Sequence, residues 1–513
     1  MHLPTFTHPS LGVQDVADRL TEAGFDLSPS RPTQRTLLDT FDGRLHAAGL
    51  RLELRDGGTR QLILSDGGAT PAQVTVDAAP TSGGSLPAGP FGARLRPVIE
   101  IRALLPVLTV SARRVSAVRR DARGKTHVVV VLQDHLGVDG TTLTSPGWTV
   151  EIEELEGYAK AAREVRDLLG SLGLAECASD VLALAAIVTG VDLRGYDGSP
   201  TVPLDRREAA LDGFRRVFAK LADAIDANWA GCVDDVDPEF LHDLRVAVRR
   251  TRSVLAQAHE VLPPGERTRM RSELGWLGAA TGAARDLDVF AIEWDGYVSA
   301  LGPPAAHLLD PVLAQVSERR AAAHATLADV LRSDRARTLI DGWRASLAAG
   351  LPAGEGQPEA DRPLGPVVAE RVAADQGRLV ARGRMIVPGS PPSELHTLRK
   401  DAKRLRYLLE CFGGVFAGKP RKLFVQRLKA LQDNLGEHND ADVHTSQLVD
   451  LSQDLHGHRS TTAETLLAVG RLTEHLDQRR RAAQDDFAQQ FAAYDTKRMR
   501  RTSEDLLRSA AGR

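Results

Sequence analysis

The spacing of apolar and polar residues divides the chain into two regions of different predicted structure. Leu50–Arg55 alternates strictly between leucine and charged residues, which is the period of a half-buried strand. Thr126–Leu132 and Thr149–Leu155 are two further strand candidates. We therefore predict a β-rich domain over residues 1–192, followed by a linker rich in Gly, Pro, Asp and Ser over residues 193–203.

From residue 204 onward, apolar residues recur at helical spacing and no segment is a convincing strand. Helices are predicted at roughly 205–230, 238–261, 266–285, 286–301, 305–332, 335–349, 367–384, 393–412, 420–435, 439–455 and 460–493. We expect an all-α domain over residues 204–505, with halves 204–350 and 366–505 joined by a Pro/Gly-rich loop, 351–365. The predicted fold class is thus α+β, with the β-rich domain first.

Two copies of one basic motif lie in the two halves of the helical region. They begin at Leu241 and Leu395, and both read L-H-x-L-R-x-x-x-(R/K)-R-x-R. The register continues downstream, where Gly282, Asp286 and Asp288 are matched by Gly436, Asp440 and Asp442. The offset is 154 residues in every case. A constant offset over this length indicates a duplicated structural unit.

Each copy, drawn as a helix, gathers its cations on one side. At about 100° per residue, the His and basic positions of one copy fall within an arc of roughly 80° and the leucines on an adjoining arc. The cationic arcs hold His242, Arg245, Arg249 and Arg252 in the first copy, and His396, Arg399, Lys403 and Arg406 in the second. A solvated helix face is the ordinary explanation of such a run. The scarcity of acidic partners at i+4 and the repetition in one register favour an anion-binding stripe.

Composition limits where a polyanion could bind. The formal net charge is −3 and the pI is about 6.6, so the chain is not globally basic and binding must rest on local segregation of charge. The three cysteines, Cys177, Cys232 and Cys411, form no C-x-x-C motif, so neither a zinc knuckle nor a disulfide framework is supported. No signal-peptide pattern is present, and the longest apolar run, Val181–Val191, is too short to cross a bilayer. We expect a cytoplasmic protein.

The duplicated motif closely resembles the CHAD family, the conserved histidine α-helical domain, over about residues 204–500. Further residues that carry the resemblance are Leu274–Leu277, Gly282 and Arg285–Val289 in the first half, and Arg427–Asp433 with Leu435–His438 in the second. The resemblance implies two pseudo-symmetric four-helix bundles whose basic helices line a shared groove. It also implies binding of inorganic polyphosphate, often at polyphosphate granules.

The first region resembles the CYTH, or triphosphate tunnel, fold through Leu38–Asp42, Gly49–Leu52 and Trp148–Glu153. The resemblance implies an antiparallel β tunnel whose carboxylates hold a metal and whose basic residues hold triphosphate. That family opens with a Glu-x-Glu-x-Lys strand, but the first glutamate here is Glu22 and the first lysine is Lys125. We therefore interpret the domain as degenerate and predict no catalytic residue in it. We expect it to bind Mg²⁺ or Mn²⁺ only if it is active.

Some residues of this degenerate domain are still candidates for binding. The candidate anion-binding residues are Arg51, Arg55, Arg113 and Arg114, and the weak metal candidates are Asp134, Glu151 and Glu153. Glu151 and Glu153 are equally well explained as the polar face of an ordinary strand.

The chemistry of the repeats suits polyphosphate, a flexible chain with about one negative charge per phosphate. Such a chain needs cations spaced along a track; arginine supplies a planar donor fork and lysine a point charge. Cations three and four residues apart on a helix lie about 5–6 Å apart. The candidate binding residues are His242, Arg245, Arg249, Arg250, Arg252, His396, Arg399, Lys400, Lys403, Arg404, Arg406, Arg421, Lys422, Arg427 and Lys429.

The predicted function is a non-catalytic polyphosphate-binding protein, and two alternatives stay open. One is a metal-dependent triphosphatase in the first domain, with the helical domain tethering its substrate. The other is an adaptor for nucleic acid or acidic proteins, although no helix-turn-helix spacing is evident and Tyr407 is the one aromatic near the stripes. We expect no specific nucleic acid and no membrane partner, and we leave the oligomeric state open.

Two smaller features also have competing explanations. Each repeat histidine could equally make a structural hydrogen bond that sets helix packing. The acidic and histidine-rich segment Glu437–His444 could suggest a metal site, but acidic residues at the start of a helix explain it more simply, and Asp286 and Asp440 could instead orient the basic residues.

Overall fold

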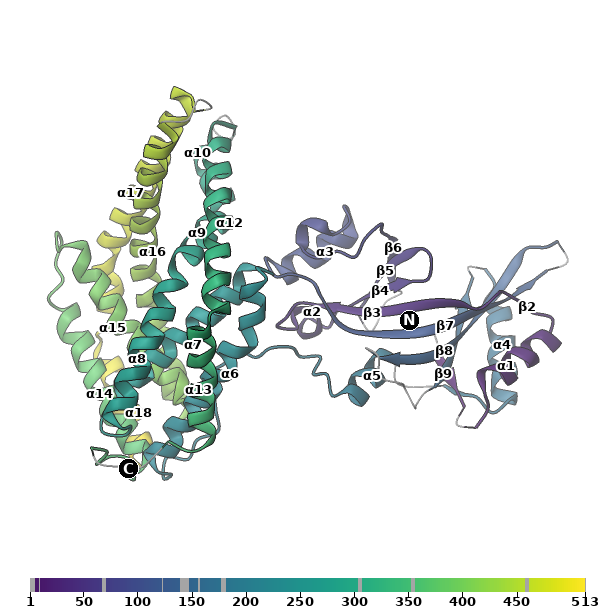
Figure 1. The fold of residues 1–513 in the computed structure, drawn as a ribbon, viewed down its shortest axis with the longest axis horizontal. Helices are drawn as coiled ribbons and strands as arrows, with labels where there is room; N and C mark the ends of the chain where they lie inside the picture. The colour runs from purple at the N-terminus through teal and green to yellow at the C-terminus, as the bar shows by residue number, and fades with distance from the viewer. Residues whose placement is uncertain are drawn as a thin grey trace. The chain divides into compact units, whose positions relative to one another are not determined.

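The computed structural model describes residues 5–8, 10–66, 71–121, 123–138, 147–155, 157–176, 181–302, 307–351, 356–456 and 461–512. Cys177 and part of the predicted 351–365 loop lie outside these ranges. The chain divides into two compact units, Met1–Asp197 and Gly198–Arg513 (Figure 1). The first unit is built on an antiparallel sheet and the second is helical, which confirms the predicted α+β class.

The first unit is organised around one sheet with the strand order β10-β1-β9-β8-β7-β3-β4-β5-β6, and β2 pairs with β7 outside this path. Its strands are β1 (Thr5–Thr7), β2 (Asp26–Leu27), β3 (Arg31–Asp39), β4 (Arg51–Asp56), β5 (Arg60–Ser65), β6 (Ala72–Thr75), β7 (Leu105–Arg120), β8 (Thr126–Val138), β9 (Trp148–Glu154) and β10 (Ala175–Glu176). Its helices are α1 (Val13–Glu22), α2 (Arg44–Ala47), α3 (Pro90–Ile99), α4 (Ala159–Ser171) and α5 (Val181–Thr189), with a short 3₁₀ turn η1 (Gly83–Ser85).

Alternation along the strands separates an apolar face of this sheet from a charged one. Leu52 of β4 is fully buried in a core with residues of β5 and α3, whereas Glu53 faces the other way. On that other face, Arg35 of β3 reaches Glu151 of β9 at 3.1 Å. The two strands are separated by β7 and β8, which in a flat sheet would place them about 14 Å apart. The sheet is therefore strongly curved, with the charged face on its concave side.

The second unit contains helices and two short 3₁₀ turns within its described residues. These are α6 (Ala210–Val233), α7 (Pro238–Gln257), α8 (Pro264–Ala280), α9 (Gly282–Ile292), α10 (Trp294–Leu301), η2 (His307–Leu309), α12 (Asp310–Arg332), α13 (Asp334–Ala348), α14 (Leu364–Gly383), α15 (Pro392–Cys411), η3 (Gly413–Val415), α16 (Gly418–His456), α17 (Ala463–Tyr494) and α18 (Lys497–Ala511). Their grouping into two four-helix bundles stays a prediction. No helix within the described ranges is both long and apolar enough to span a bilayer.

Two predicted helix boundaries are wrong: the one at 285/286 falls inside α9, and another falls inside α16. The sequence suggested two helices, 420–435 and 439–455, but α16 runs without a break from Gly418 to His456. Its buried residues Leu431, Leu435, His438 and Ala441 continue one stripe at helical spacing through Gly436. Packing of this stripe keeps the glycine helical, so the acidic residues after Gly436 do not begin a new helix.

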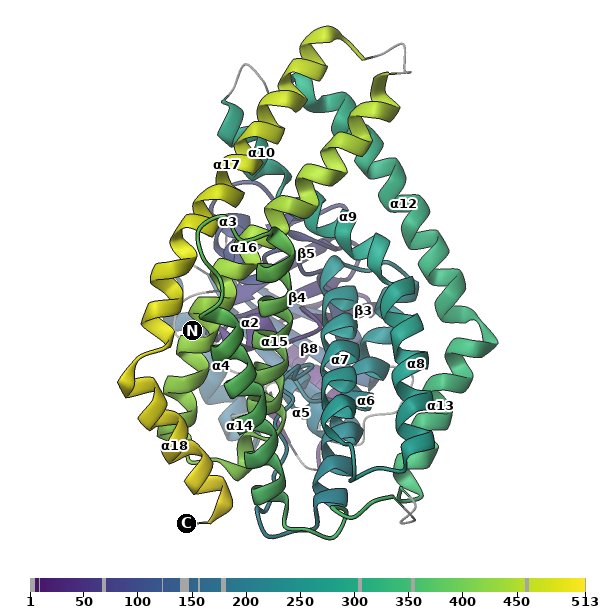
Figure 2. The ribbon, with the colours of Figure 1, turned by 90° about the vertical axis from the view of Figure 1, so that its left-hand side faces the viewer.

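The two motif helices lie next to each other at the centre of the helical unit (Figure 2). Helix α7 begins cleanly because the Asp237 side chain accepts hydrogen bonds from the backbone N–H groups of Glu239 and Phe240, at 2.9 and 3.3 Å. It packs closely on α6, where a side-chain carbon added at Gly231 would lie 2.2 Å from the Phe240 ring. Only glycine permits this approach of the ring to the α6 backbone.

We expect Gly231→Ala to lower the free energy of unfolding by about 1–3 kcal/mol, because the added methyl group overpacks the α6–α7 contact. Gly377→Ala is the matched control: Gly377 also lies inside a helix, α14, and an added carbon there meets no atom within 4 Å. That substitution should be neutral or stabilising, since alanine favours the helix. Urea unfolding of both variants tests this, and equal midpoints would contradict it.

Candidate functional site

Helices α7 and α15 are tied together at one end by a side-chain contact. Arg250 of α7 donates to Glu410 of α15 at 2.9 Å and also to the carbonyl oxygen of Gly198 at 3.2 Å. Its guanidinium carbon lies 5.9 Å from the centre of the Tyr407 ring, which is buried. Arg250 therefore connects the two motif helices, and its charge is already balanced.

Four cations from the two helices form what we call the basic cluster: Arg245 and Arg249 of α7, and Arg399 and Lys403 of α15. Each is half-buried. Burial lowers the pKa of Arg245, and the neighbouring positive charge of Arg249 lowers it further. Burial likewise lowers the pKa of Arg399, with Arg249 of the other helix adding to the effect. The stripes therefore converge instead of pointing apart.

Lys403 shows the strongest effect of this convergence. Burial, followed by the positive charges of Arg399 and Arg249, lowers its pKa to about 7. A lysine ammonium is ordinarily charged up to about pH 10. Near neutral pH, burial and the neighbouring cations therefore raise the free energy of the charged Lys403 ammonium. A bound anion would lower it.

The protein balances only part of this charge. Arg399 donates to Asp440 of α16 at 3.0 Å. Arg245 instead donates to two neutral acceptors near the end of α8, the Gly278 carbonyl oxygen at 3.0 Å and the Thr281 hydroxyl at 2.7 Å. The buried Nε atoms of Arg249 and Arg399 have no acceptor among the described residues. The described acceptors therefore leave these two N–H groups unsatisfied.

Glycines bring the arginine side chains close to the neighbouring helices. An added carbon at Gly278 of α8 would lie 3.3 Å from an Arg252 nitrogen, and one at Gly282 would lie 3.8 Å from an Arg245 nitrogen. In the second copy, an added carbon at Gly436 would lie 4.0 Å from an Arg399 nitrogen. The Gly282 and Gly436 of the repeat therefore face the equivalent arginines, 245 and 399.

Several of the predicted binding residues are held in other contacts. Arg404 lies 3.8 Å from Asp401, and Arg406 lies 3.2 Å from Glu410, each on its own helix. Arg421 donates to the Leu409 carbonyl oxygen at 3.4 Å, at the end of α15. His396 is exposed and its Nδ1 lies 2.7 Å from the Asn439 side-chain oxygen. His242 is half-buried on α7.

The remaining predicted residues are exposed, and they differ in which way they face. Arg252, Lys400, Lys422, Arg427 and Lys429 make up this set. On α16, Lys429 precedes Gly436 by seven residues and shares its direction to within about 20°, whereas Arg427 precedes it by nine and points about 180° away. Lys429 therefore extends the face that meets Arg399, and Arg427 does not.

Several side chains of the segment Glu437–His444 contact neighbouring helices. Glu437 accepts from Arg479 of α17 at 2.7 Å, and Asn439 and Asp440 contact α15 as described. His444 is buried and hydrogen-bonded to the Tyr297 hydroxyl. Asp440 thus orients Arg399, which is one of the roles that the sequence left open for it. The segment lies inside α16 and does not begin a helix.

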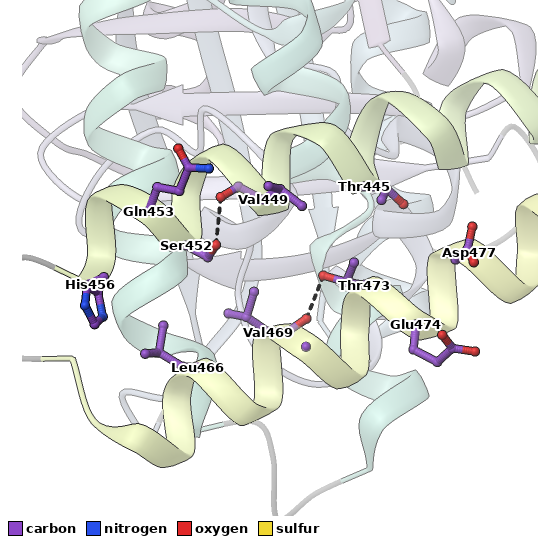
Figure 3. Close-up of a pocket in the computed structure, with 11 residues that line it drawn as sticks. Thr445, Val449, Ser452, Gln453, His456, Leu466, Val469, Thr473, Glu474 and Asp477 are labelled. Atoms are coloured by element: carbon purple, nitrogen blue, oxygen red, sulfur yellow. Dashed lines mark hydrogen bonds between the residues drawn. The ribbon is translucent and has the colours of Figure 1, made fainter.

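A separate surface pocket lies between α16 and α17, away from the basic cluster (Figure 3). Two of its hydroxyl groups are bonded into their own helices, Ser452 to the Val449 carbonyl oxygen and Thr473 to the Val469 carbonyl oxygen. Its charged lining includes Glu474 and Asp477 and no arginine or lysine. This pocket is unsuited to a polyanion.

The concave face of the β-unit holds a second charged group, centred on Arg35. Arg35 donates to both oxygens of Glu53, at 2.7 and 3.0 Å, and to Glu151 at 3.1 Å, with all three side chains about 5% exposed. Although burial opposes it, Glu53 and Glu151 raise the pKa of Arg35. Sequence reasoning identified Glu151 but missed Arg35 and gave Glu53 no role.

The other predicted residues of this unit lie on both faces of the sheet. Arg55 donates to Glu53 at 2.6 Å, and Arg114 donates to Glu153 at 3.2 Å, on the concave face. Burial lowers the pKa of Arg51 to about 10 although Glu53 lies nearby. Arg113 precedes Arg114 by one residue and is paired with Asp134 on the neighbouring strand. The side chains of Arg113 and Asp134 therefore lie on the face opposite to that of Arg114.

These residues do not fit the divalent metal of the tunnel family. Asp134 is on the wrong face, and both Glu53 and Glu151 already bind guanidinium groups. The Glu151 Oε2 atom alone lacks a hydrogen-bond donor, and it lies 3.6 Å from Arg55. A hard divalent cation requires several free oxygens. Within the described ranges, no group of three or more His, Cys, Asp or Glu side chains is arranged to hold a metal.

Comparison with known proteins confirms the resemblance of the repeats. Residues 216–449 match the family model of the CHAD domain. An uncharacterised Mycobacterium tuberculosis protein is 25% identical over 213 residues, and the match spans 41% of this chain and 40% of that protein. The chain thus covers less than half the length of this curated relative.

Two solved structures are also similar. The CHAD domain of the plant Ricinus communis is 26% identical with a TM-score of 0.49, covering 57% of this chain and 94% of that one. A putative adenylyl cyclase from Hippeastrum, described as having a dominant triphosphatase activity, is 16% identical with a TM-score of 0.27, covering 38% of this chain and 98% of that one. Both scores are below 0.5, and the resemblance to CHAD proteins rests on the match of residues 216–449 to the family model.

We expect Arg249→Met to raise the pKa of Lys403, because it removes a positive charge contributed by the opposite helix. Arg252→Met is the control, since Arg252 is exposed on the same stripe and is not among the charges that act on Lys403. Titration of the lysine ¹³Cε resonance in labelled protein measures the shift. An unchanged Lys403 pKa in Arg249→Met would show that the two helices are not electrostatically coupled.

Proposed function

We propose that the helical unit binds inorganic polyphosphate at the basic cluster between α7 and α15. The observation that carries this proposal is the convergence of cations from two helices around the half-buried Lys403, where burial and then the charges of Arg399 and Arg249 lower its pKa to about 7. Gathering cations in this way costs free energy through their mutual repulsion and desolvation, and a bound anion would recover part of that cost.

The charge balance of the cluster supports a polyanion. Four cations meet there, and among the described residues Asp440 is the one carboxylate that forms an ion pair with any of them. The exposed cations Arg252 and Lys429 extend the positive surface along α7 and α16. A linear chain of phosphates is long enough to contact successive cations spaced about 5–6 Å apart along a helix. The CHAD match supports the same ligand, because that domain is linked to polyphosphate binding.

Nucleic acid is a weaker candidate. Base stacking requires an accessible aromatic ring, and Tyr407 of α15 is 3% exposed and packed beside Arg250. A ligand without bases requires no such platform. Association with polyphosphate granules and a cytoplasmic location stay predictions that follow from this ligand.

The combined variant Arg249→Gln and Lys403→Gln should bind long-chain polyphosphate about 10²- to 10⁴-fold more weakly at 150 mM salt, since each charge-assisted contact contributes about 1.5–3 kcal/mol. Isothermal titration with polyphosphate of defined length measures the affinity, and far-ultraviolet circular dichroism checks the fold.

The matched control is Arg427→Gln combined with Arg498→Gln. It removes the same charge from exposed positions, one on the far face of α16 and one on α18. Equal losses in the two double variants would show that net charge alone governs binding and would contradict the proposed site.

The affinity for polyphosphate should fall as pH rises above about 7. Bound phosphate favours the charged ammonium and raises the pKa of Lys403 from its free value of about 7, so binding above that pH takes up a proton. The affinity then falls by up to tenfold per pH unit until the raised pKa is reached. Below pH 7 the ammonium is charged in both states and contributes no pH dependence.

Lys403→Arg isolates this effect, because arginine keeps its charge throughout the range. Titration of the ligand itself is common to both proteins and cancels in their ratio. The wild-type affinity should drop relative to the variant between pH 7 and 9. Parallel profiles over that range would exclude Lys403 from the site.

A further inference from the structure

The concave face of the β-unit balances its charges internally. Four arginines (35, 51, 55 and 114) face three glutamates (53, 151 and 153), and every one of these glutamates lies within 3.2 Å of an arginine nitrogen. Burial opposes ionisation of Glu53, but Arg35 and Arg55 lower its pKa well below the ordinary range. Glu53 is therefore charged and paired at neutral pH.

Arg35 occupies the central position in this arrangement. It binds Glu53 through two parallel hydrogen bonds and reaches Glu151 with its remaining nitrogen. Because β3 and β9 are separated by two strands, this one side chain links residues on opposite sides of the concave face. Bidentate pairing of this kind is geometrically specific, and breaking a buried pair leaves an uncompensated charge.

We propose that Arg35 serves as the fixed counter-ion of Glu53 and Glu151, in the role that a divalent cation would fill, so that the β-unit is independent of metal. A divalent ion placed between these carboxylates would have to displace a buried guanidinium or lie beside it. Displacement breaks three hydrogen bonds, and the second arrangement sets two like charges together. Both arrangements disfavour binding.

The proposal has a direct consequence for a single substitution. Removal of the Arg35 charge leaves Glu53 and Glu151 buried and close together without the guanidinium that lies between them, which is a site that attracts a divalent ion. Arg35→Met should therefore create metal binding that the natural chain lacks. This inference is independent of polyphosphate binding by the helical unit.

Titration of the full chain with Mn²⁺, followed by the electron paramagnetic resonance of the free ion, tests the inference. Glu151→Gln controls for ions bound elsewhere on the chain. The wild-type protein and Glu151→Gln should bind the same amount of Mn²⁺. Binding in the wild type that is lost in Glu151→Gln would overturn the proposal, and this comparison does not require any Arg35 variant to fold.

Arg35→Met provides the second measurement. Its melting temperature should lie below that of the wild type and should rise when millimolar Mn²⁺ is added, with one extra ion bound. The combined variant Arg35→Met and Glu53→Gln, which removes both charges, should gain neither the ion nor the stabilisation. A folded Arg35→Met protein that binds no extra Mn²⁺ would also overturn the proposal.

Discussion

Burial of the leucines on α7 and α15 determines where the arginines of the helical unit can point. Leu241, Leu244, Leu398 and Leu405 are at most 1% exposed. Each contributes about 1.5–3 kcal/mol through removal from water. Rotating either helix to separate the cations would expose these leucines. The apolar packing therefore overrides the charge repulsion, which at an effective dielectric constant of about 20 is about 3 kcal/mol for two charges 6 Å apart.

The two copies of the motif satisfy this constraint differently. Arg245 of the first copy is held by a carbonyl and a hydroxyl group, whereas Arg399 of the second is held by a carboxylate. Asp288 is buried, with Arg320 and His324 as partners, but its equivalent Asp442 is exposed. Duplication has thus preserved the direction of the cations while their supporting contacts have diverged. The direction is fixed by helix packing, and the supports are free to change.

Sequence periodicity was sufficient for the features that depend on neighbouring residues. The alternation of Leu50–Arg55 placed Arg51, Glu53 and Arg55 on one face, and the repeat placed the cations of α7 and α15 on one side each. The helical period also distinguishes Arg427 from Lys429, which face different ways although both were predicted to bind. Residues with such periods are predictable because a strand or helix fixes their direction locally.

The features that sequence reasoning missed depend on residues far apart in the chain. Arg35 and Glu151 are separated by 116 positions, and only the curvature of the sheet joins them. The continuity of α16 through Gly436 likewise depends on packing against α15 and α17, which outweighs the weak helix preference of glycine. Local pattern does not reveal the contact between Arg35 and Glu151, and it does not by itself decide whether the helix continues through Gly436.

The two units differ in how their positive charges are balanced, and this difference determines which of them can bind an anion. In the β-unit, Arg35 and its neighbours are matched by glutamates that share the same concave face, so little charge is left for a ligand to neutralise. In the helical unit, Arg249 has no carboxylate partner among the described residues, and Lys403 is held near the midpoint of its titration at neutral pH. A site whose charges are already paired must break those pairs to accept an ion, whereas an unpaired cluster gains free energy from the first anion that reaches it. The proposed polyanion site therefore lies in the helical unit.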